Sequence, residues 1–351
     1  MVGQKSTKAQ SVFFHIFSCL LGFIMVYPLL WLLMSSFKSN DTMFHNAWSL
    51  IPEKWAAVTN YLSGFEGVAG IPFWRFFANS AIVTVVSVVG SIFCSLLAAY
   101  ALSRLKFKGS GFWFGCVVMT MMIPSQVMVV PQYIILKHLG LSDTLVSMTL
   151  PWVFGHGFFI FLIAQYMRGI PRDLDEAAML DGCSKAGILF KIMIPIVKPA
   201  IVKPAIVTAS IFAFYWIWQD FFQPLIFVSS PENYTIPLAL NLYLDPNSYN
   251  NYGGLFAMSA VSLLPVIHMS AVVQTYIDGL LDDGELKEDR LEPLPVRLAV
   301  IIDLNLRNEL LHDGPAFLWS HGCIQLFEVD EYFVNAIGSH LVCFNRLLFR
   351  S

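Results

Sequence analysis

The sequence predicts an all-α polytopic membrane protein with about six transmembrane helices, a polar two-helix loop and a small mixed C-terminal tail. Hydrophobic residues make up 56% of its 351 positions and charged residues only 13%, whereas a soluble domain carries about 25% charged residues. Several apolar runs also reach the roughly 20 residues that a helix needs to cross a bilayer. The net charge of -3 provides no basic surface for nucleic acid, so membrane lipid is the expected environment.

The expected spans alternate with polar loops along the chain. The first follows Lys5 and Lys8; it exceeds the apolar core of a signal peptide and lacks a small-residue cleavage site, so we expect a retained helix. The third is expected to be broken by Pro124 and Pro131, which a membrane helix tolerates only where neighbouring helices satisfy the freed carbonyl groups. The six ranges are about 11–34, 76–102, 112–136, 145–166, 206–228 and 255–277.

The basic residues predict the orientation of these spans. Positively charged residues gather in cytoplasmic loops of membrane proteins. With residues 1–10 in the cytoplasm, only Lys38, Lys54, Arg75 and Lys137 of the permease part, 11–284, fall outside. The inside loops then hold the larger set Lys5, Lys8, Arg104, Lys106, Lys108, Arg168, Arg172, Lys185, Lys191, Lys198 and Lys203. We therefore expect both termini in the cytoplasm.

A polar island at 171–195 separates the fourth span from the fifth. Asp173 is expected to cap a short helix, with Glu176 three residues later reaching back to the cap. Gly182 is expected to end that helix, because glycine accepts the left-handed conformation of many helix ends. Ser184 is expected to cap a second helix, so the island forms a bent hairpin outside the bilayer.

One face of the first helix in this island carries Leu174, Ala177 and Ala178 at helical spacing. Their small methyl groups would let another surface approach closely. Pro195 removes an amide and would end or kink the second helix, which carries Ile188 and Ile192.

The island resembles the EAA loop of ABC-importer permease subunits. Glu176-Ala177-Ala178, Gly182, Ile192 and Pro195 keep every spacing of that pattern. The resemblance implies a coupling element that docks into a cleft of a separate ATPase subunit. It assigns coupling to Glu176, Ala177, Ala178, Asp181, Gly182, Ile192 and Pro195.

Further fragments between residues 11 and 288 resemble the permeases of carbohydrate-type ABC importers, in the same order along the chain. They include Asn79-Ser80, Ala99 to Arg104, Trp218-Gln219-Asp220 and Tyr234-Thr235. The resemblance implies a multi-pass protein of the bacterial cytoplasmic (inner) membrane that works by alternating access. The implied partners are an ABC ATPase dimer that binds ATP and Mg, a second permease subunit, an extracytoplasmic solute-binding protein and a carbohydrate; related solutes such as glycerol phosphates stay open.

No catalytic, cofactor-binding or metal site is expected in this chain. The segment 182–187 has the two glycines of a P-loop, but Ile188 and Leu189 stand where Lys and Ser/Thr must bind phosphate and magnesium. Trp218, Gln219 and Asp220 are candidates for the substrate path, since they offer an aromatic face and hydrogen-bonding groups and a carboxylate within a span is a functional candidate. The alternative is a polar patch that packs against the partner permease or lies near the outer interface.

Two segments depart from the family pattern. IVKPA occurs twice in tandem at 196–205; five added helical residues would turn a face by about 140°, and the prolines favour a connector, so we expect the extra copy to be absorbed at the membrane surface. After the permease part, residues 285–351 form an atypical tail, expected in the cytoplasm.

An alternative function, that of an enzyme, is suggested by a motif in the tail. Ser320 to Leu326 resembles a motif of L,D-transpeptidase-like enzymes, with Gln325 replacing an arginine. The resemblance would make Cys323 the nucleophile and His321 its base, in a membrane-anchored enzyme. A small tail packing on itself is the favoured interpretation, because the cytoplasm holds no peptidoglycan. An ion-coupled carrier is disfavoured because Asp220 is the one acidic residue clearly inside a span.

Overall fold

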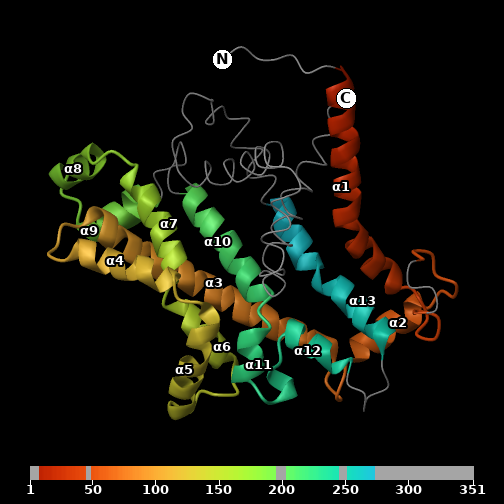
Figure 1. Ribbon diagram of the computed structural model, residues 1–351. Helices are drawn as coiled ribbons and strands as arrows, with labels where there is room; N and C mark the ends of the chain where they lie inside the picture. The colour runs from red at the N-terminus through yellow and green to blue at the C-terminus, as the bar shows by residue number, and fades with distance from the viewer. Residues whose placement is uncertain (1–7, 45–48, 195–202, 245–250, 273–351) are drawn as a thin grey trace. The chain divides into compact units, whose positions relative to one another are not determined.

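The computed structural model describes residues 8–44, 49–194, 203–244 and 251–272 (Figure 1). Apart from isolated bridges, the described residues form helices and turns. They fall into two compact units, one from 8–65 with 251–272 and the other from 66–244. The tandem repeat up to residue 202, Pro195 and the whole tail lie outside the described residues.

The first unit is built from α1 (Lys8–Ser35), α2 (Ala57–Glu66) and α13 (Tyr252–Ser262). α1 packs on α13, where the rings of Trp31 and Phe256 meet edge to face at 5.3 Å. The amide of Asn60 in α2 donates to the carbonyl oxygens of Ser36 and Lys38, both at 2.8 Å. These bonds tie α2 to the turn that follows α1 and satisfy two of its carbonyl groups.

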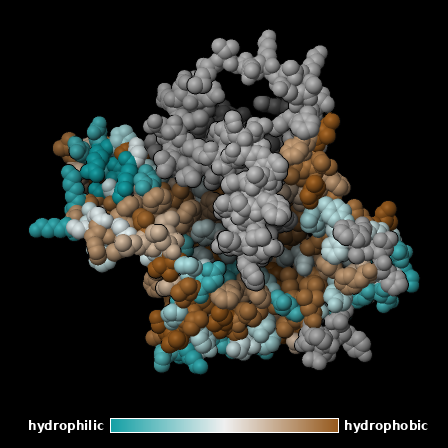
Figure 2. Space-filling model, viewed as in Figure 1, coloured by the Kyte–Doolittle hydropathy of each residue, from teal (hydrophilic) through white to brown (hydrophobic). Residues whose placement is uncertain are grey.

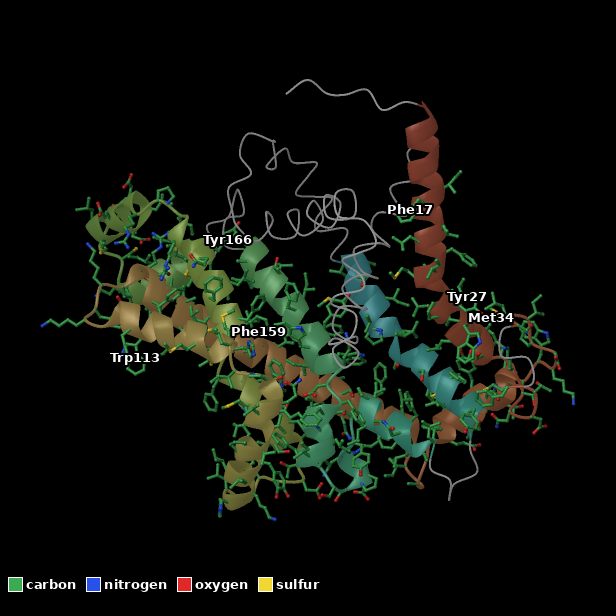
Figure 3. The ribbon with its side chains drawn as sticks, viewed as in Figure 1. Phe17, Tyr27, Met34, Trp113, Phe159 and Tyr166 are labelled. Carbon is green, nitrogen blue, oxygen red and sulfur yellow. The ribbon has the colours of Figure 1, made fainter. Side chains whose placement is uncertain are left out.

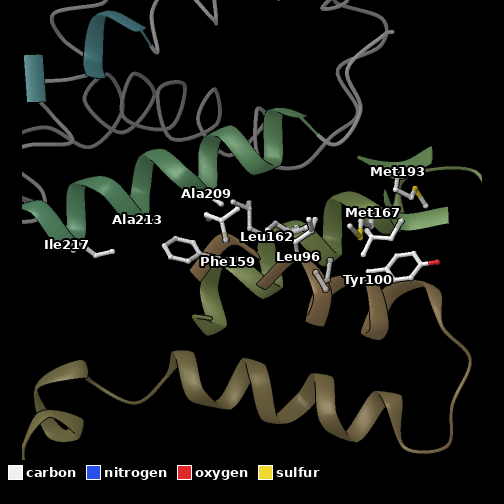
Figure 4. Close-up of a cluster of buried hydrophobic side chains, with 14 of the residues drawn as sticks. Leu96, Tyr100, Phe159, Leu162, Met167, Met193, Ala209, Ala213 and Ile217 are labelled. Carbon is white, nitrogen blue, oxygen red and sulfur yellow. The ribbon is translucent and has the colours of Figure 1, made fainter. Parts of the chain in front are cut away.

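The second unit is organised around the long helix α3 (Phe73–Arg104). It packs against α6 (Leu145–Val153), α7 (Gly157–Arg168) and α10 (Lys203–Trp218). Small side chains on α3 let these helices approach closely, and the apolar cluster between them is fully or nearly buried (Figure 4). Its labelled members are Leu96, Tyr100, Phe159, Leu162, Met167, Met193, Ala209, Ala213 and Ile217.

Shorter elements complete the second unit. They are α4 (Ser110–Met121), α5 (Ser125–His138), α8 (Asp173–Leu180), α9 (Lys185–Gly187), a π-helical turn (Ile188–Met193), α11 (Phe222–Phe227), a 3-10 turn (Pro231–Asn233) and α12 (Ile236–Leu242).

Two residues near the start of α3 hold the segment before α12. The Asn79 amide donates to the carbonyl oxygens of Glu232 (2.8 Å) and Tyr234 (3.0 Å). Ser80 Oγ accepts the N–H of Ile236 at 2.8 Å.

Asp143, between α5 and α6, joins two loops of this unit. Its backbone is left-handed (φ 60°), and its Oδ1 accepts the N–H groups of Ser229 (2.9 Å) and Ser230 (2.8 Å). The Ser230 hydroxyl also donates to Asp143, and these bonds hold the pKa of Asp143 below its usual value. The charged carboxylate therefore ties the loop before α6 to the loop after α11.

The expectation of several apolar spans is confirmed. Among the described residues, Phe73–Arg104, Leu145–Arg168 and Tyr252–Val272 are long and apolar enough to cross a membrane, and Leu20–Ser35 and Ala205–Trp218 are shorter apolar helices. α4 and α5 form a further pair, bent by 102°. The break expected at Pro124 is thus confirmed, whereas the break expected at Pro131 is wrong, because α5 continues through that residue.

The expectation that the fifth span, 206–228, is one continuous helix is wrong. α10 ends at Trp218, and α11 begins only at Phe222. The side chain of Asp220 accepts the N–H of Gln223 at 3.1 Å. This bond starts a new helix where the sequence pattern predicts that the old one continues.

Large apolar side chains cover much of the surface of the second unit (Figure 2). Phe112 and Trp113 of α4 are 70% and 57% exposed, and Trp113 points away from the helices (Figure 3). Exposed apolar area on this scale marks contact with lipid or with another protein. Hydrophilic residues gather over α8 and its surroundings, and smaller hydrophilic patches lie elsewhere on the same face (Figure 2).

Replacing Gly90 with alanine should loosen the packing of α3 on α6. A Cβ atom at this position would lie 2.9 Å from the Cγ1 of Val153, a stiff β-branched side chain. We expect a loss of about 1–3 kcal/mol, the usual range for overpacking, measured as a lower melting temperature in detergent. Gly115→Ala in α4 is the control, because nothing lies within 4 Å of its added Cβ; equal melting temperatures for the two variants would contradict the packing argument.

Candidate coupling loop and substrate path

The first helix of the polar island, α8, begins differently from the expectation. Arg172 occupies the capping position in a helical conformation, without a side-chain cap, and Asp173 is already the first helical residue. The expectation that Asp173 caps the helix is therefore wrong. Asp173, Asp175 and Glu176 all lie in the first turn, where negative charge is favourable beside the open N–H groups.

The end of α8 agrees with the sequence analysis. Gly182 has φ +81°, the left-handed conformation that glycine adopts without steric cost. The Gly182 N–H donates to Met179 O (3.1 Å) and the Cys183 N–H to Ala178 O (2.9 Å). This is the bond pattern of the Schellman motif, so Gly182 is confirmed as the bend of the hairpin.

The second half of the hairpin is also capped as expected. Ser184 Oγ accepts the N–H of Gly187 at 3.0 Å. The helix then widens into a π-helical turn at Ile188–Met193. Ile188, Leu189 and Met193 are buried in the core of the second unit, which fixes this half of the hairpin to the membrane helices.

The residues assigned to coupling divide between surface and core. Ala178 is only 5% exposed and belongs to the apolar cluster, and Ile192 packs against that cluster. Leu174, at 39%, and Ala177 are exposed, so the three residues Leu174, Ala177 and Ala178 are not all available to a partner. The exposed members of the set are Glu176, Ala177, Asp181 and Gly182.

Arg104, the last residue of α3, joins the hairpin to two other helices. Its side chain is 2% exposed and its Nη1 donates to Asp175 Oδ2 of α8 at 3.1 Å, the one ion pair found among the described residues. Its Nη2 donates to the carbonyl oxygens of Met167, in α7, and of Ile170 (2.8 Å) just beyond it. From the sequence, Arg104 is expected only as a topological charge and as part of a family fragment, because a charge pattern does not show which acidic residue an arginine will meet.

A second bond at the same end of α3 reaches the other half of the hairpin. The Tyr100 hydroxyl donates to the carbonyl oxygen of Lys185 at 2.9 Å. Tyr100 and Arg104 are four residues apart and so lie on one face of α3. Both halves of the hairpin are therefore hydrogen-bonded to that face.

The three candidates for the substrate path occupy different environments. Trp218 is buried, and its ring stacks on Phe214 at 5.7 Å and meets Phe77 edge to face at 5.6 Å. Gln219 is exposed. Asp220 holds the start of α11 through Gln223, whose side-chain oxygen in turn accepts the indole N–H of Trp152 at 3.0 Å. The structure thus gives Trp218 and Asp220 structural contacts of their own.

Known proteins resemble this chain over most of its length. The probable ABC transporter permease protein YurM of Bacillus subtilis is 36% identical over 263 residues, which cover 74% of this chain and 83% of that protein. An arabinooligosaccharides transport system permease protein of Halalkalibacterium halodurans is 32% identical over 76% of this chain and 93% of that protein. The diacetylchitobiose uptake system permease protein of Streptomyces coelicolor is 28% identical over 78% of this chain and 88% of that protein.

The fold is also similar to that of a solved transporter. A chain of a bacterial ABC transporter involved in the import of the acidic polysaccharide alginate matches with a TM-score of 0.65 and 24% identity, over 78% of this chain and 99% of that one. Residues 90–282 match the family described as the binding-protein-dependent transport system inner membrane component. This chain therefore belongs to the permease family of binding-protein-dependent ABC transporters, whose members are multi-pass transporter subunits of the inner membrane.

Proposed function

We propose that this chain is one permease subunit of an importer that moves a sugar or oligosaccharide into the cell by alternating access. The observation that carries the proposal is the bent hairpin of residues 173–194. Its exposed first helix ends at the bend, Gly182, and its second half packs on the membrane helices through Ile188, Leu189 and Met193. The carbohydrate substrate is supported by relatives that are named for arabinooligosaccharides and diacetylchitobiose.

The energy for transport comes from a separate ABC ATPase dimer that binds ATP and Mg. Closure of this dimer displaces the hairpin, and the attached helices tilt to open the path outward. A second permease subunit completes the path, and an extracytoplasmic binding protein delivers the sugar. In this arrangement the hairpin and both termini face the cytoplasm.

The hairpin residues have different roles in this proposal. Glu176, Ala177 and Asp181 are exposed and contact the ATPase, while Gly182 sets the angle between the two halves. Ala178 and Ile192 hold the hairpin against its own chain. Pro195, which lies outside the described residues, keeps its place in the set only through the family resemblance. Docking therefore uses one side of α8 and anchoring uses the other.

The substrate path is proposed to pass Trp218, Gln219 and Asp220. Gln219 is free to reach a solute because its side chain is exposed. Asp220 uses one carboxylate oxygen, Oδ1, to hold the N–H of Gln223, and a carboxylate has further lone pairs for sugar hydroxyl groups. Trp218 would provide an apolar surface at this place.

Replacing Gly182 with valine should uncouple ATP hydrolysis from uptake. No atom lies within 4 Å of an added Cβ, so the cost comes from the backbone at φ +81°, about 1–2 kcal/mol for an L-residue. The hairpin should relax to another angle while the chain still inserts. We expect less sugar uptake per ATP hydrolysed in proteoliposomes that contain the ATPase, the second permease and the binding protein.

The matched control is Gly182→Asn, because asparagine tolerates the left-handed conformation. It should transport nearly as well as the unaltered chain. Uptake by Gly182→Val equal to that of Gly182→Asn would refute the role of the bend.

Replacing Asp220 with asparagine tests the substrate path separately from the fold. Asparagine keeps an oxygen for the Gln223 N–H, so the melting temperature should not change, whereas Asp220→Ala should lose about 1 kcal/mol of stability. If the carboxylate binds sugar, Asp220→Asn should raise the sugar concentration for half-maximal uptake about fivefold, because a charged hydrogen bond is about 1 kcal/mol stronger than a neutral one. An unchanged value would leave Asp220 with its structural contact alone.

A further inference from the structure

The guanidinium of Arg104 lies where three helices meet. From the end of α3 it reaches the carboxylate of Asp175 in the first turn of α8 and the carbonyl oxygens of Met167 and Ile170 at the end of α7. The end of a helix leaves carbonyl groups without partners and favours a positive charge. Arg104 therefore binds the end of one helix and the beginning of the next at once.

This contact requires an arginine rather than a positive charge alone. The planar fork of a guanidinium can donate to several acceptors in fixed directions, which a lysine ammonium on a flexible stem does not reproduce. The neighbouring Lys106 and Lys108 are exposed along an open groove of about 470 Å³. Those two lysines suffice as topological charges, whereas the burial of Arg104 carries a desolvation cost and needs a further explanation.

The opposite end of α3 is also attached to a loop. Asn79 and Ser80 hold Glu232, Tyr234 and Ile236 through three hydrogen bonds. Residues 79 and 104 lie 25 positions apart in one helix, which corresponds to about 37 Å, more than the roughly 30 Å hydrocarbon core of a bilayer. In the proposed arrangement, α3 is therefore long enough to connect the hairpin with a loop on the far side of the membrane.

We propose that Arg104 is a positioning residue of the transport cycle: through Asp175 it makes α3 move with the coupling helix α8. The inference rests on the proposed function, since it assumes that an ATPase displaces the hairpin. The covalent chain already connects the hairpin to α7 and, beyond residue 194, towards α10. The contact between Arg104 and Asp175 also connects the hairpin to α3. Through the bonds of Asn79 and Ser80, α3 then transmits the displacement to the segment 232–236.

The test compares two carboxylates of α8 in the complete transporter. Asp175→Asn removes the charge that Arg104 binds, and Asp173→Asn removes an exposed charge from the same helical turn. We expect Asp175→Asn to assemble with the ATPase and hydrolyse ATP, but to import about tenfold less solute per ATP, the size of one lost charge-assisted hydrogen bond. Asp173→Asn should match the unaltered chain.

A second variant separates positioning from stability. Asparagine leaves the Arg104 charge buried without its counter-charge, which can unfold a protein, whereas replacing a buried pair with apolar residues is often neutral or stabilising. Arg104→Met combined with Asp175→Leu should therefore assemble normally and still import about tenfold less solute per ATP. The proposal is overturned if either variant imports a normal amount of solute per ATP. It is also overturned if neither variant yields folded protein, because the contact between Arg104 and Asp175 would then be purely structural.

The same experiment distinguishes this inference from the proposed function. The unaltered chain is measured first for assembly with the ATPase and for ATP-dependent uptake. If it neither assembles nor depends on ATP, the proposed function fails. If it does both while the Arg104 and Asp175 variants keep their ratio of uptake to hydrolysis, only the positioning role fails.

Discussion

The arrangement of the hairpin depends on the hydrogen bonds of the buried Arg104 guanidinium. An arginine removed from water needs acceptors for its donors. Here Asp175, Met167 and Ile170 accept from the two Nη groups, while the buried Nε has no partner among the described residues. These acceptors fix where α7 ends and where α8 lies. The exposed side of α8, with Glu176 and Ala177, is thereby held in a defined position for a partner.

Local chemistry explains which features of the hairpin the sequence predicts correctly. The bend at Gly182 and the cap at Ser184 each depend on one residue type and on neighbours within a few positions. Asp173 was expected to cap α8 on the same local grounds, but the helix begins one position earlier than that role allows. Asp175, in the same turn, is held by Arg104 from a distant part of the chain, and the spacing of the hairpin residues contains no information about that contact.

The long-range contacts also explain several fragments of the family resemblance. Asn79-Ser80 and Tyr234-Thr235 stand far apart in the sequence, yet the structure brings them together: Asn79 donates to the carbonyl oxygen of Tyr234, and Ser80 accepts from the N–H that follows Thr235. Tyr100 and Arg104 likewise meet the hairpin. A single sequence shows such fragments in order but not which of them are partners. The sequence does not predict the end of α10 at Trp218, because the apolar pattern continues on both sides of Asp220. The Asp220 carboxylate accepts the N–H of Gln223 in the first turn of α11.

The geometry of an α-helix explains why the neighbouring residues Ala177 and Ala178 have different surroundings. Adjacent residues point about 100° apart around the helix axis, so a surface that packs tightly on one of them does not cover the other. Ala178 faces the core of its own chain and Ala177 faces outward. A larger side chain at Ala178 would push α8 away from the membrane helices and strain the contact between Arg104 and Asp175, while a larger one at Ala177 would meet only a docked partner. Under the proposed function, the small residues of this motif therefore serve two interfaces: Ala178 packs within the subunit, and Ala177 would contact the ATPase subunit.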